Sequence, residues 1–253
     1  EDDFEANVTT GYASRFSNDI SGTAGIKKLG AGSLELSGVN TFTGKIQING
    51  GTLVANRQSN LGGTTSKVQF GGGTLDLGNY NGGTTFDRQI AVGSGNGWLK
   101  ASETLIYTLS TIDKAADGTA GILYFTDKVL SIPGSLELNA YWGGDYTVAA
   151  GSTLSGTGGV MGDLTVNGTL APGNSPGTMT VSGNVVQNPS GTFQVQIDGT
   201  GTGTGAGNYD RLVITGATST YTAGGTLETQ LRGISGSANN NYSPPLGQGF
   251  QIV

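Results

Sequence analysis

The sequence holds few of the side chains that usually carry out catalysis. Its 253 residues include no Cys and no His, so neither a Cys–His pair nor a Ser–His–Asp triad can form. A Ser–Lys pair is chemically conceivable, because Ser is abundant and seven lysines are present, but solvated surface lysines are the simpler interpretation. The absence of Cys also excludes disulfides and thiolate metal ligands.

Carboxylates are the next candidates, because some glycoside-cleaving enzymes use clustered Asp and Glu side chains. Glu35, Asp76 and Glu137 each occupy the polar position of a similar short segment, so they could line up on one outer face. The alternative is that these carboxylates only keep that face soluble. We expect the alternative, and therefore no catalytic residue and no enzyme activity in this segment. A catalytic domain elsewhere in a longer protein is left open.

Metal and cofactor sites are not expected either. The calcium-binding nonapeptide pattern Gly-Gly-x-Gly-x-Asp is not repeated, and the partial match at Gly72 to Asp76 stands alone. The loop of an EF-hand is also missing. We expect no metal and no cofactor.

Charge and hydropathy exclude two classes of partner. The net charge is −6 and the pI is about 4.5, which leaves no basic footprint for a nucleic acid. No apolar run approaches the roughly 18 residues that a membrane-spanning helix needs, so we expect no direct membrane insertion of this segment. Glu1–Phe4 does not resemble a signal peptide and 250–253 reads like the middle of a strand, so we expect a fragment of a longer chain.

Aromatic side chains gather in one part of the chain. They are Trp98, Tyr107, Tyr124, Phe125, Tyr141, Trp142 and Tyr146. Packing in the core and between coils is the favoured interpretation. The alternative is a binding patch for a host protein or glycan on a protruding loop, built around Trp98, Tyr141 and Trp142.

A short repeated unit must position all of these residues. The unit reads Gly-polar-Leu-polar-apolar and often ends in Gly or Asn, as at 32–38, 73–78 and 134–139. Alternation with period 2 places Leu34 and Leu36 on one face of a strand and Glu35 on the other. Such strands bury one face only when they are stacked, and their recurrence about every 20 residues suits a solenoid coil of three strands. The sequence predicts an all-β, single-stranded right-handed parallel β-helix of about twelve coils with a C-terminal capping region.

The chain divides into three parts on this pattern. Residues 1–81 form coils that contain the clearest repeat, and residues 82–150 form irregular coils or a loop insert that continues the β-helix. Residues 151–253 form a C-terminal β-helical region. The stretch 82–133 matches the repeat poorly, and no role is assigned to it.

Two groups of segments resemble known sequences. Residues 30–44 and 49–53, with a lead-in at 16–22, resemble the passenger-associated transport repeat of type V (classical) autotransporters. Residues 154–160, 168–181, 209–216 and 224–227 resemble the autochaperone region that ends such passengers. The resemblance assigns folding roles to one set of residues, which are Leu154, Leu164, Val166, Leu170, Pro172, Gly173, Asn174, Met179, Val181, Asp210, Arg211, Leu212, Ile214 and Leu227.

The resemblance implies a function and a location. It implies the C-terminal stalk of a passenger, truncated before its linker and barrel, that templates folding and outer-membrane secretion and displays an N-terminal effector. Its implied partners are its own C-terminal outer-membrane β-barrel and the barrel-assembly machinery. Its implied location is the cell surface or the extracellular space of a Gram-negative bacterium, reached through the periplasm and outer membrane. Alternatives of the same fold are a surface adhesin and the stalk of a subtilisin-like protease passenger.

Overall fold

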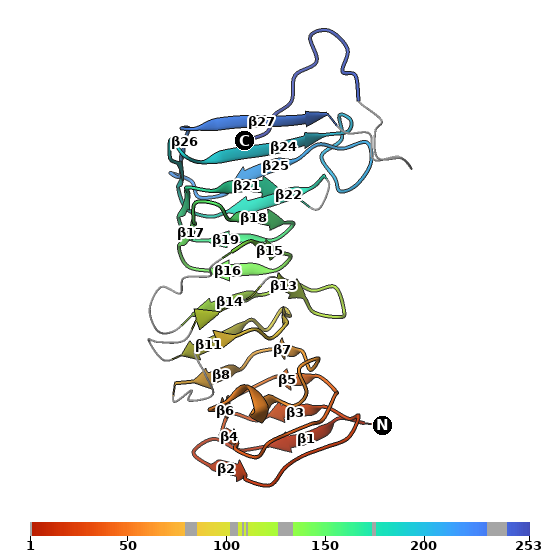
Figure 1. The fold of residues 1–253 in the computed structure, drawn as a ribbon, viewed down its shortest axis with the longest axis vertical. Helices are drawn as coiled ribbons and strands as arrows, with labels where there is room; N and C mark the ends of the chain where they lie inside the picture. The colour runs from red at the N-terminus through yellow and green to blue at the C-terminus, as the bar shows by residue number, and fades with distance from the viewer. Residues whose placement is uncertain are drawn as a thin grey trace. The chain divides into compact units, whose positions relative to one another are not determined.

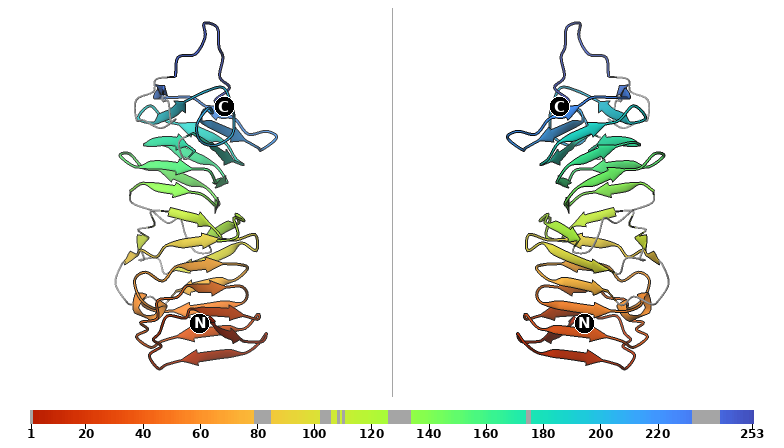
Figure 2. Two further views of the ribbon diagram at one scale, coloured as in Figure 1. Left: turned by 90° about the vertical axis from the view of Figure 1, so that its right-hand side faces the viewer. Right: turned by 90° about the vertical axis from the view of Figure 1, so that its left-hand side faces the viewer.

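The computed structural model describes residues 2–78, 85–101, 106–107, 109, 111–125, 134–173, 176–231 and 242–253. The chain forms two compact units, Glu1–Ile132 and Pro133–Val253. Both are stacks of short parallel strands (Figures 1 and 2). Among the described residues, the only helix is the single 3-10 turn η1 (Gln58–Leu61), and no helix is long and apolar enough to cross a membrane.

Two sheets run through the first unit. The first contains β1 (Phe4–Asn7), β3 (Ile26–Leu29), β5 (Ile46–Ile48), β7 (Val68–Phe70), β10 (Ile90–Val92) and β13 (Thr111–Lys114). The second contains β2 (Ala13–Phe16), β4 (Ser33–Leu36), β6 (Thr52–Ala55), β8 (Thr74–Leu77), β11 (Gly97–Ala101) and β14 (Ile122–Phe125). Successive strands of one sheet are separated by a strand of the other, so each coil contributes one strand to each sheet.

The register of these strands builds dry columns of apolar side chains. Ile26 pairs with Ile46, and Ile46 pairs with Val68, all in parallel register. In the other sheet, Leu34 pairs with Leu53 and Leu53 with Leu75. These side chains are buried, while the residues between them in each strand are partly exposed. A parallel pairing without register slip is what keeps the alternating pattern facing one core.

The third side of the first unit contains little regular strand. β9 (Thr85–Phe86) and β12 (Ile106–Tyr107) form a two-stranded pair there. Elsewhere, segments of neighbouring coils exchange backbone hydrogen bonds: Thr41 N–H donates to the carbonyl of Ile20, and Gly63 N–H donates to that of Phe42. The side chain of Phe42 is buried beneath this side. In the described part of this unit, the coils that contain Thr41 and Gly63 have two strands and one irregular side, whereas the coils that contain β9 and β12 have the three strands expected.

The second unit has strands on three sides. One sheet contains β15 (Leu136–Leu138), β18 (Thr153–Gly156), β21 (Thr169–Pro172), β24 (Thr192–Ile197) and β27 (Thr226–Leu231). The next contains β16 (Tyr141–Gly143), β19 (Gly159–Met161), β22 (Thr178–Val181) and β25 (Arg211–Ile214). The third contains β17 (Tyr146–Val148), β20 (Leu164–Val166), β23 (Val185–Gln187) and β26 (Tyr221–Thr222). The parallel ladder Leu154–Leu170–Phe193–Leu227 shows the same inward stacking as the first unit.

A row of polar side chains links the coils of the second unit at one corner. Asp145 Oδ1 accepts the backbone N–H of Asp163 at 2.8 Å, and Asp163 Oδ1 accepts that of Asn184 at 2.7 Å. Asn184 Oδ1 accepts the N–H of Thr220 at 3.1 Å. Each residue lies directly before a strand of the third sheet, so the side chain of one coil satisfies the backbone of the next.

These strands confirm an all-β parallel solenoid with almost no helix. The count of about twelve coils, the right-handed winding and a separate capping region stay predictions. The division at 81 and 150 also stays a prediction, although β10, β11, β13 and β14 extend the two sheets of the first unit through part of 82–133.

Candidate functional site

The residues assigned to folding lie mainly in the inward rows of the second unit. Buried there are Leu154, Leu164, Val166, Leu170, Met179, Val181 and Leu212. Ile214 on β25 is half-buried, and Leu227 on β27 is 54% exposed because, among the described strands, β27 pairs with β24 alone. Asn174 lies outside the described residues. The set therefore spans both the packed rows and the last strand of the unit.

A turn follows the end of β21. Pro172 ends that strand, and Gly173 has a φ of +90°, which a residue with a side chain rarely adopts. Gly173 and Gly156 exchange backbone hydrogen bonds of 2.8 and 3.0 Å in an antiparallel bridge. A Cβ atom on Gly173 would lie 2.7 Å from Asp210 Oδ1, so the turn packs directly on that carboxylate.

Asp210 connects Gly177, directly before β22, to β24 of the next coil. Its Oδ1 accepts the N–H of Gly177 and its Oδ2 accepts the N–H of Gln196, both at 2.8 Å. The residue is 2% exposed. Burial raises the pKa of Asp210 to about 6, although the two N–H donors act in the opposite direction. We call Asp210 with Gly177 and Gln196 the aspartate latch.

The Gly/Thr-rich excursion 199–207 closes over the same turn. Asn208 organises the excursion, because its Oδ1 accepts the N–H of Gly203 and its Nδ2 donates to the carbonyls of Thr204, Gly205 and Ala206. Gly205 N–H donates to the carbonyl of Pro176 at 3.0 Å. The two segments that carry the resemblance to an autochaperone region, 168–181 and 209–216, are thus joined in space.

A small polar cavity of about 160 Å³ adjoins the latch. It is lined by Glu137, Ser155, Ala171, Pro172, Gly173, Gln196 and Asp210. Gln196 Oε1 is buried and has no hydrogen-bond partner. Among these lining residues there is no Lys or Arg, so the cavity offers acceptors and no positive charge.

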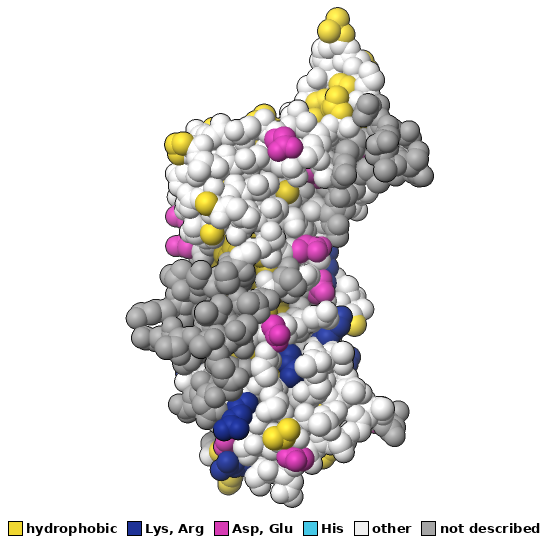
Figure 3. Space-filling view, viewed as in Figure 1, with side chains coloured by type: hydrophobic (Ala, Val, Ile, Leu, Met, Phe, Trp, Pro, Cys, Tyr) yellow, Lys and Arg dark blue, Asp and Glu magenta, His cyan; other side chains and the backbone are white. Residues whose placement is uncertain are grey.

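The three candidate carboxylates do not form a catalytic group. Glu35 and Asp76 project from the same sheet, but Val54 lies between them in the ladder. Glu35 forms an ion pair with Arg15, with 3.6 Å between Oε2 and Nε, and Asp76 forms one with Lys100, with 3.1 Å between Oδ2 and Nζ. Glu137 belongs to the other sheet, on β15. Figure 3 shows acidic and basic side chains scattered over one face rather than gathered. Among the described residues, no three acidic side chains are placed to hold a metal ion.

The proposed aromatic patch is divided between the surface and the core. Trp98 projects outward from β11 and stacks on Tyr124 of β14, with ring centroids 5.6 Å apart. Trp142 is only 4% exposed, donates from Nε1 to the carbonyl of Asp145, and packs edge-on against Tyr146. Tyr141, its neighbour in β16, is half-buried. The burial of Trp142 favours the packing interpretation for this residue, and the binding patch stays a prediction.

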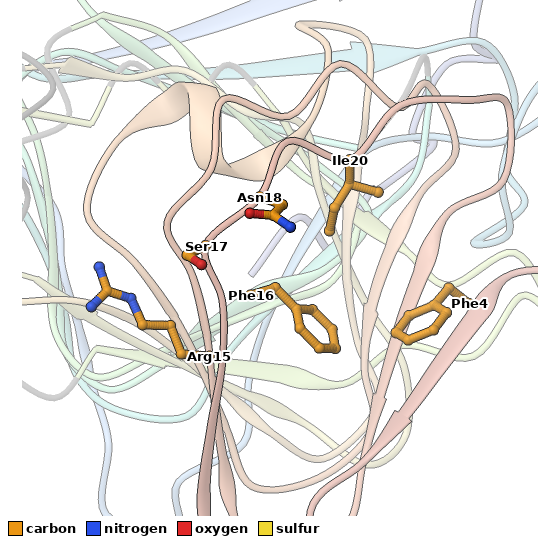
Figure 4. Close-up of a pocket in the computed structure, with 6 residues that line it drawn as sticks. All are labelled: Phe4, Arg15, Phe16, Ser17, Asn18 and Ile20. Atoms are coloured by element: carbon orange, nitrogen blue, oxygen red, sulfur yellow. The ribbon is translucent and has the colours of Figure 1, made fainter.

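Apolar cavities lie at an outer strand of each unit. In the first unit, a cavity of about 350 Å³ is lined by Phe4, Arg15, Phe16, Ser17, Asn18 and Ile20. Figure 4 shows the Phe4 and Phe16 rings close together in it, with the Arg15 guanidinium turned away. In the second unit, a cavity of about 310 Å³ adjoins β27 and includes Phe193, Leu227 and Ile252 among its lining.

Two buried cations were not expected from the sequence. Lys28 is fully buried, and its Nζ donates to the carbonyls of Leu29, Gly30 and Gly50. Arg88 is also buried and donates to several carbonyls around η1, including those of Gln58 and Gly62. The position of Lys28 two residues after Ile26 in a strand was the available signal, because alternation places both side chains inward.

Comparisons with known proteins place these features in a family. The model of the passenger-associated transport repeat matches residues 26–55, which is the segment from β3 to β6. The neisserial autotransporter lipoprotein NalP from Neisseria meningitidis serogroup B, found in two strains, is 52% identical over 54 residues, or 21% of this chain. The adhesin BmaC autotransporter from Brucella suis is 32% identical over 178 residues, or 69% of this chain. No solved structure matches significantly.

The chain spans 5% of the length of each of these relatives. Both relatives are autotransporters, and both matches agree with the repeat and with the parallel solenoid. The predicted location at the surface or outside a Gram-negative bacterium is confirmed on the same basis. This chain is part of an autotransporter passenger domain that contains passenger-associated transport repeats.

Proposed function

We propose that this chain is the C-terminal stalk of its passenger, where it templates folding and outer-membrane secretion and displays an N-terminal effector. The observation that supports the proposal is the aspartate latch. It closes the coils of the second unit, which is compact by itself. A unit with its own core and its own closure can fold before the rest of the chain and then serve as a template.

The energy for secretion comes from stacking in this proposal. Each inward Leu, Val or Ile contributes about 1.5–3 kcal/mol when it is fully buried. A coil that folds outside the cell therefore opposes movement of the chain back through the membrane. The partners in this step are the protein's own C-terminal outer-membrane β-barrel and the barrel-assembly machinery. The proposal includes about twelve right-handed coils and a C-terminal capping region.

A surface-display experiment tests this role. The variant Leu212→Asp in the full-length protein puts a charge into the inward row, where Leu212 pairs with Met179. Val213→Asp is the matched control, since Val213 points outward from the same strand. We expect Leu212→Asp to abolish surface display while the barrel still inserts, and Val213→Asp to retain display. Normal display of Leu212→Asp would refute the template role.

An adhesin is the second candidate. The relative BmaC is named an adhesin, and in this chain the stacked pair Trp98 and Tyr124 faces outward from the first unit. Such a pair offers the flat apolar faces on which sugars and partner side chains pack. Purified wild-type chain and the double variant Trp98→Ala/Tyr124→Ala should then differ in binding to host cells or glycans. Equal binding by both would remove this candidate.

The proposal assigns no enzyme activity to this segment. The scattered carboxylates support it, because Glu35, Asp76 and Glu137 do not converge. A subtilisin-like protease carried by the stalk stays a prediction from sequence resemblance. Assaying the full-length protein and this chain against casein would separate the two cases, and cleavage by this chain alone would refute the assignment.

A further inference from the structure

The cavity beside the aspartate latch contains one acceptor that lacks a donor. Gln196 Oε1 is buried and has no hydrogen-bond partner, and Gln196 lines the same cavity as Asp210. A buried acceptor without a donor is unfavourable relative to a paired one. The Asp210 carboxylate forms no ion pair with a described residue, and both of its hydrogen bonds come from backbone N–H groups.

A proton on Asp210 would supply a donor for Gln196 Oε1. A neutral carboxylic acid has an O–H that can donate, while both of its oxygens keep lone pairs that can accept the two backbone N–H groups. We propose that Asp210 and Gln196 form a proton-binding site, in which the protonated Asp210 donates its O–H to Gln196 Oε1 while the N–H groups of Gly177 and Gln196 stay in place. The site rests on the cavity, the orphaned acceptor and the two backbone donors, and not on the proposed function.

The charged groups around Asp210 favour proton uptake. Glu137 on β15 lines the cavity and adds negative charge, although Asn139 donates to one of its oxygens. Arg211 follows Asp210 on the outward side of β25, where it is half-buried. The sequence positions 171–177 and 199–207 contain no ionisable side chain, and Gln194 and Gln196 on β24 are neutral. Asp198 directly follows β24 and accepts the N–H of Gly207. Burial raises the pKa of Asp210 to about 6, which agrees with a proton held in mildly acidic surroundings.

The consequence is a coil closure that tightens on mild acidification. Between the ordinary aspartate pKa and about pH 6, the folded chain holds a proton that the unfolded chain has lost, so acidification in this window favours the folded state. Most carboxylates with native partners act in the opposite sense, because they lose their contacts when protonated. The second unit should therefore resist mildly acidic surroundings.

Titration of the 253-residue chain by carbon-13 NMR of the aspartate carboxyl groups tests the site. The signal lost in Asp210→Asn identifies Asp210. We expect its midpoint near pH 6 in the wild type and at higher pH in Gln196→Glu, where two carboxyl groups would share one proton. A wild-type midpoint near 4, the ordinary range for Asp, would overturn the proposal.

Two further measurements exclude other occupants of the cavity. Glu137→Gln should keep the titration of Asp210 and lower its midpoint only slightly, because burial is the main cause of the raised pKa. Disappearance of the titration in that variant would place the proton on Glu137 and overturn the assignment. Addition of Ca²⁺ at pH 7.4 should leave the thermal midpoint unchanged. A Ca²⁺-dependent rise that Asp210→Asn removes would show that the cavity holds a metal ion rather than a proton.

Discussion

Asp210 Oδ1 accepts the backbone N–H of Gly177 at 2.8 Å across 33 residues of sequence. The other carboxylate oxygen accepts the N–H of Gln196 on β24, the preceding strand of the same coil. One buried side chain thus holds a turn, a strand and the start of β25 in a fixed arrangement. Replacing Asp210 by a residue without an acceptor would leave the N–H groups of Gly177 and Gln196 without this partner.

Asp210→Ala should destabilise the second unit by an amount that depends on pH. The folded-state pKa of about 6 lies above the ordinary value of 3.8, so the stabilising effect of the proton is complete below the ordinary value and is lost as pH rises through about 6. Loss of two hydrogen bonds to a charged group predicts a cost of about 2–4 kcal/mol at pH 7, and up to about 3 kcal/mol more at pH 4. Denaturant unfolding at several pH values measures this difference, and a larger cost at pH 7 than at pH 4 would contradict it.

Lys28→Met should destabilise the first unit. Methionine keeps the apolar stem of the side chain but leaves the carbonyls of Leu29, Gly30 and Gly50 without the ammonium, so we expect a loss of about 1–3 kcal/mol. Burial also lowers the pKa of Lys28, and that desolvation reduces the net loss. Lys27→Met is the control, since Lys27 projects outward toward Glu5. Urea unfolding should show a clear shift for Lys28→Met alone, and equal shifts would contradict the burial argument.

The two tryptophans should respond differently to substitution and to quenchers. Trp142→Ala empties a packed position and should cost about 3–5 kcal/mol, whereas Trp98→Ala removes one stacked ring from the surface and should cost about 0.5–1.5 kcal/mol. In single-tryptophan variants made with Phe, Trp142 should emit at the shorter wavelength and resist acrylamide. Equal quenching of the two would show that Trp142 is accessible.

Gly159→Ala should be among the most damaging small substitutions in the second unit. A Cβ atom there would lie 1.9 Å from the carbonyl oxygen of Thr180 on the paired strand, so the two strands must separate. Gly144→Ala is a useful comparison, because Gly144 has a φ of +116° but open space around its Cβ position. We expect about 3 kcal/mol or more for the first and about 1–3 kcal/mol for the second from backbone strain. Thermal unfolding would rank the two, and the reverse order would contradict the contact.

The parallel solenoid was predictable because alternation is a local property. The pattern around Leu34 and Leu36 places both side chains inward, and its recurrence requires stacking, which the ladder Leu34–Leu53–Leu75 confirms. The irregular third side of the first unit was not predictable in the same way. Its segments are joined by backbone bonds such as that from Thr41 to Ile20, which any residue type can make.

The surroundings of Asp210 and Trp142 could not be predicted from the sequence pattern. Sequence resemblance assigned a folding role to Asp210, but its partners are backbone N–H groups of Gly177 and Gln196, and backbone donors leave no signature in side-chain types. The sequence also left open whether Trp142 lies in the core or in a surface patch. In β16, Trp142 points inward, and Tyr141 and Gly143 point outward. The sequence does not show where the preceding corner ends, so it does not show which residues of the strand point inward.

The row of corner side chains makes the coils of the second unit interchangeable. Asp145 accepts the backbone N–H of Asp163, and Asp163 in turn accepts that of Asn184. Tyr146 on β17 pairs in parallel with Leu164 on β20. Each coil therefore offers the next one a side-chain acceptor at the corner and a strand edge beside it. Removing Tyr146–Asp163 would join Asp145 to Leu164, one full coil later in the sequence. Solenoids built in this way can lengthen or shorten during evolution by duplication or loss of single coils, because each coil contacts its neighbours through the same kind of interface.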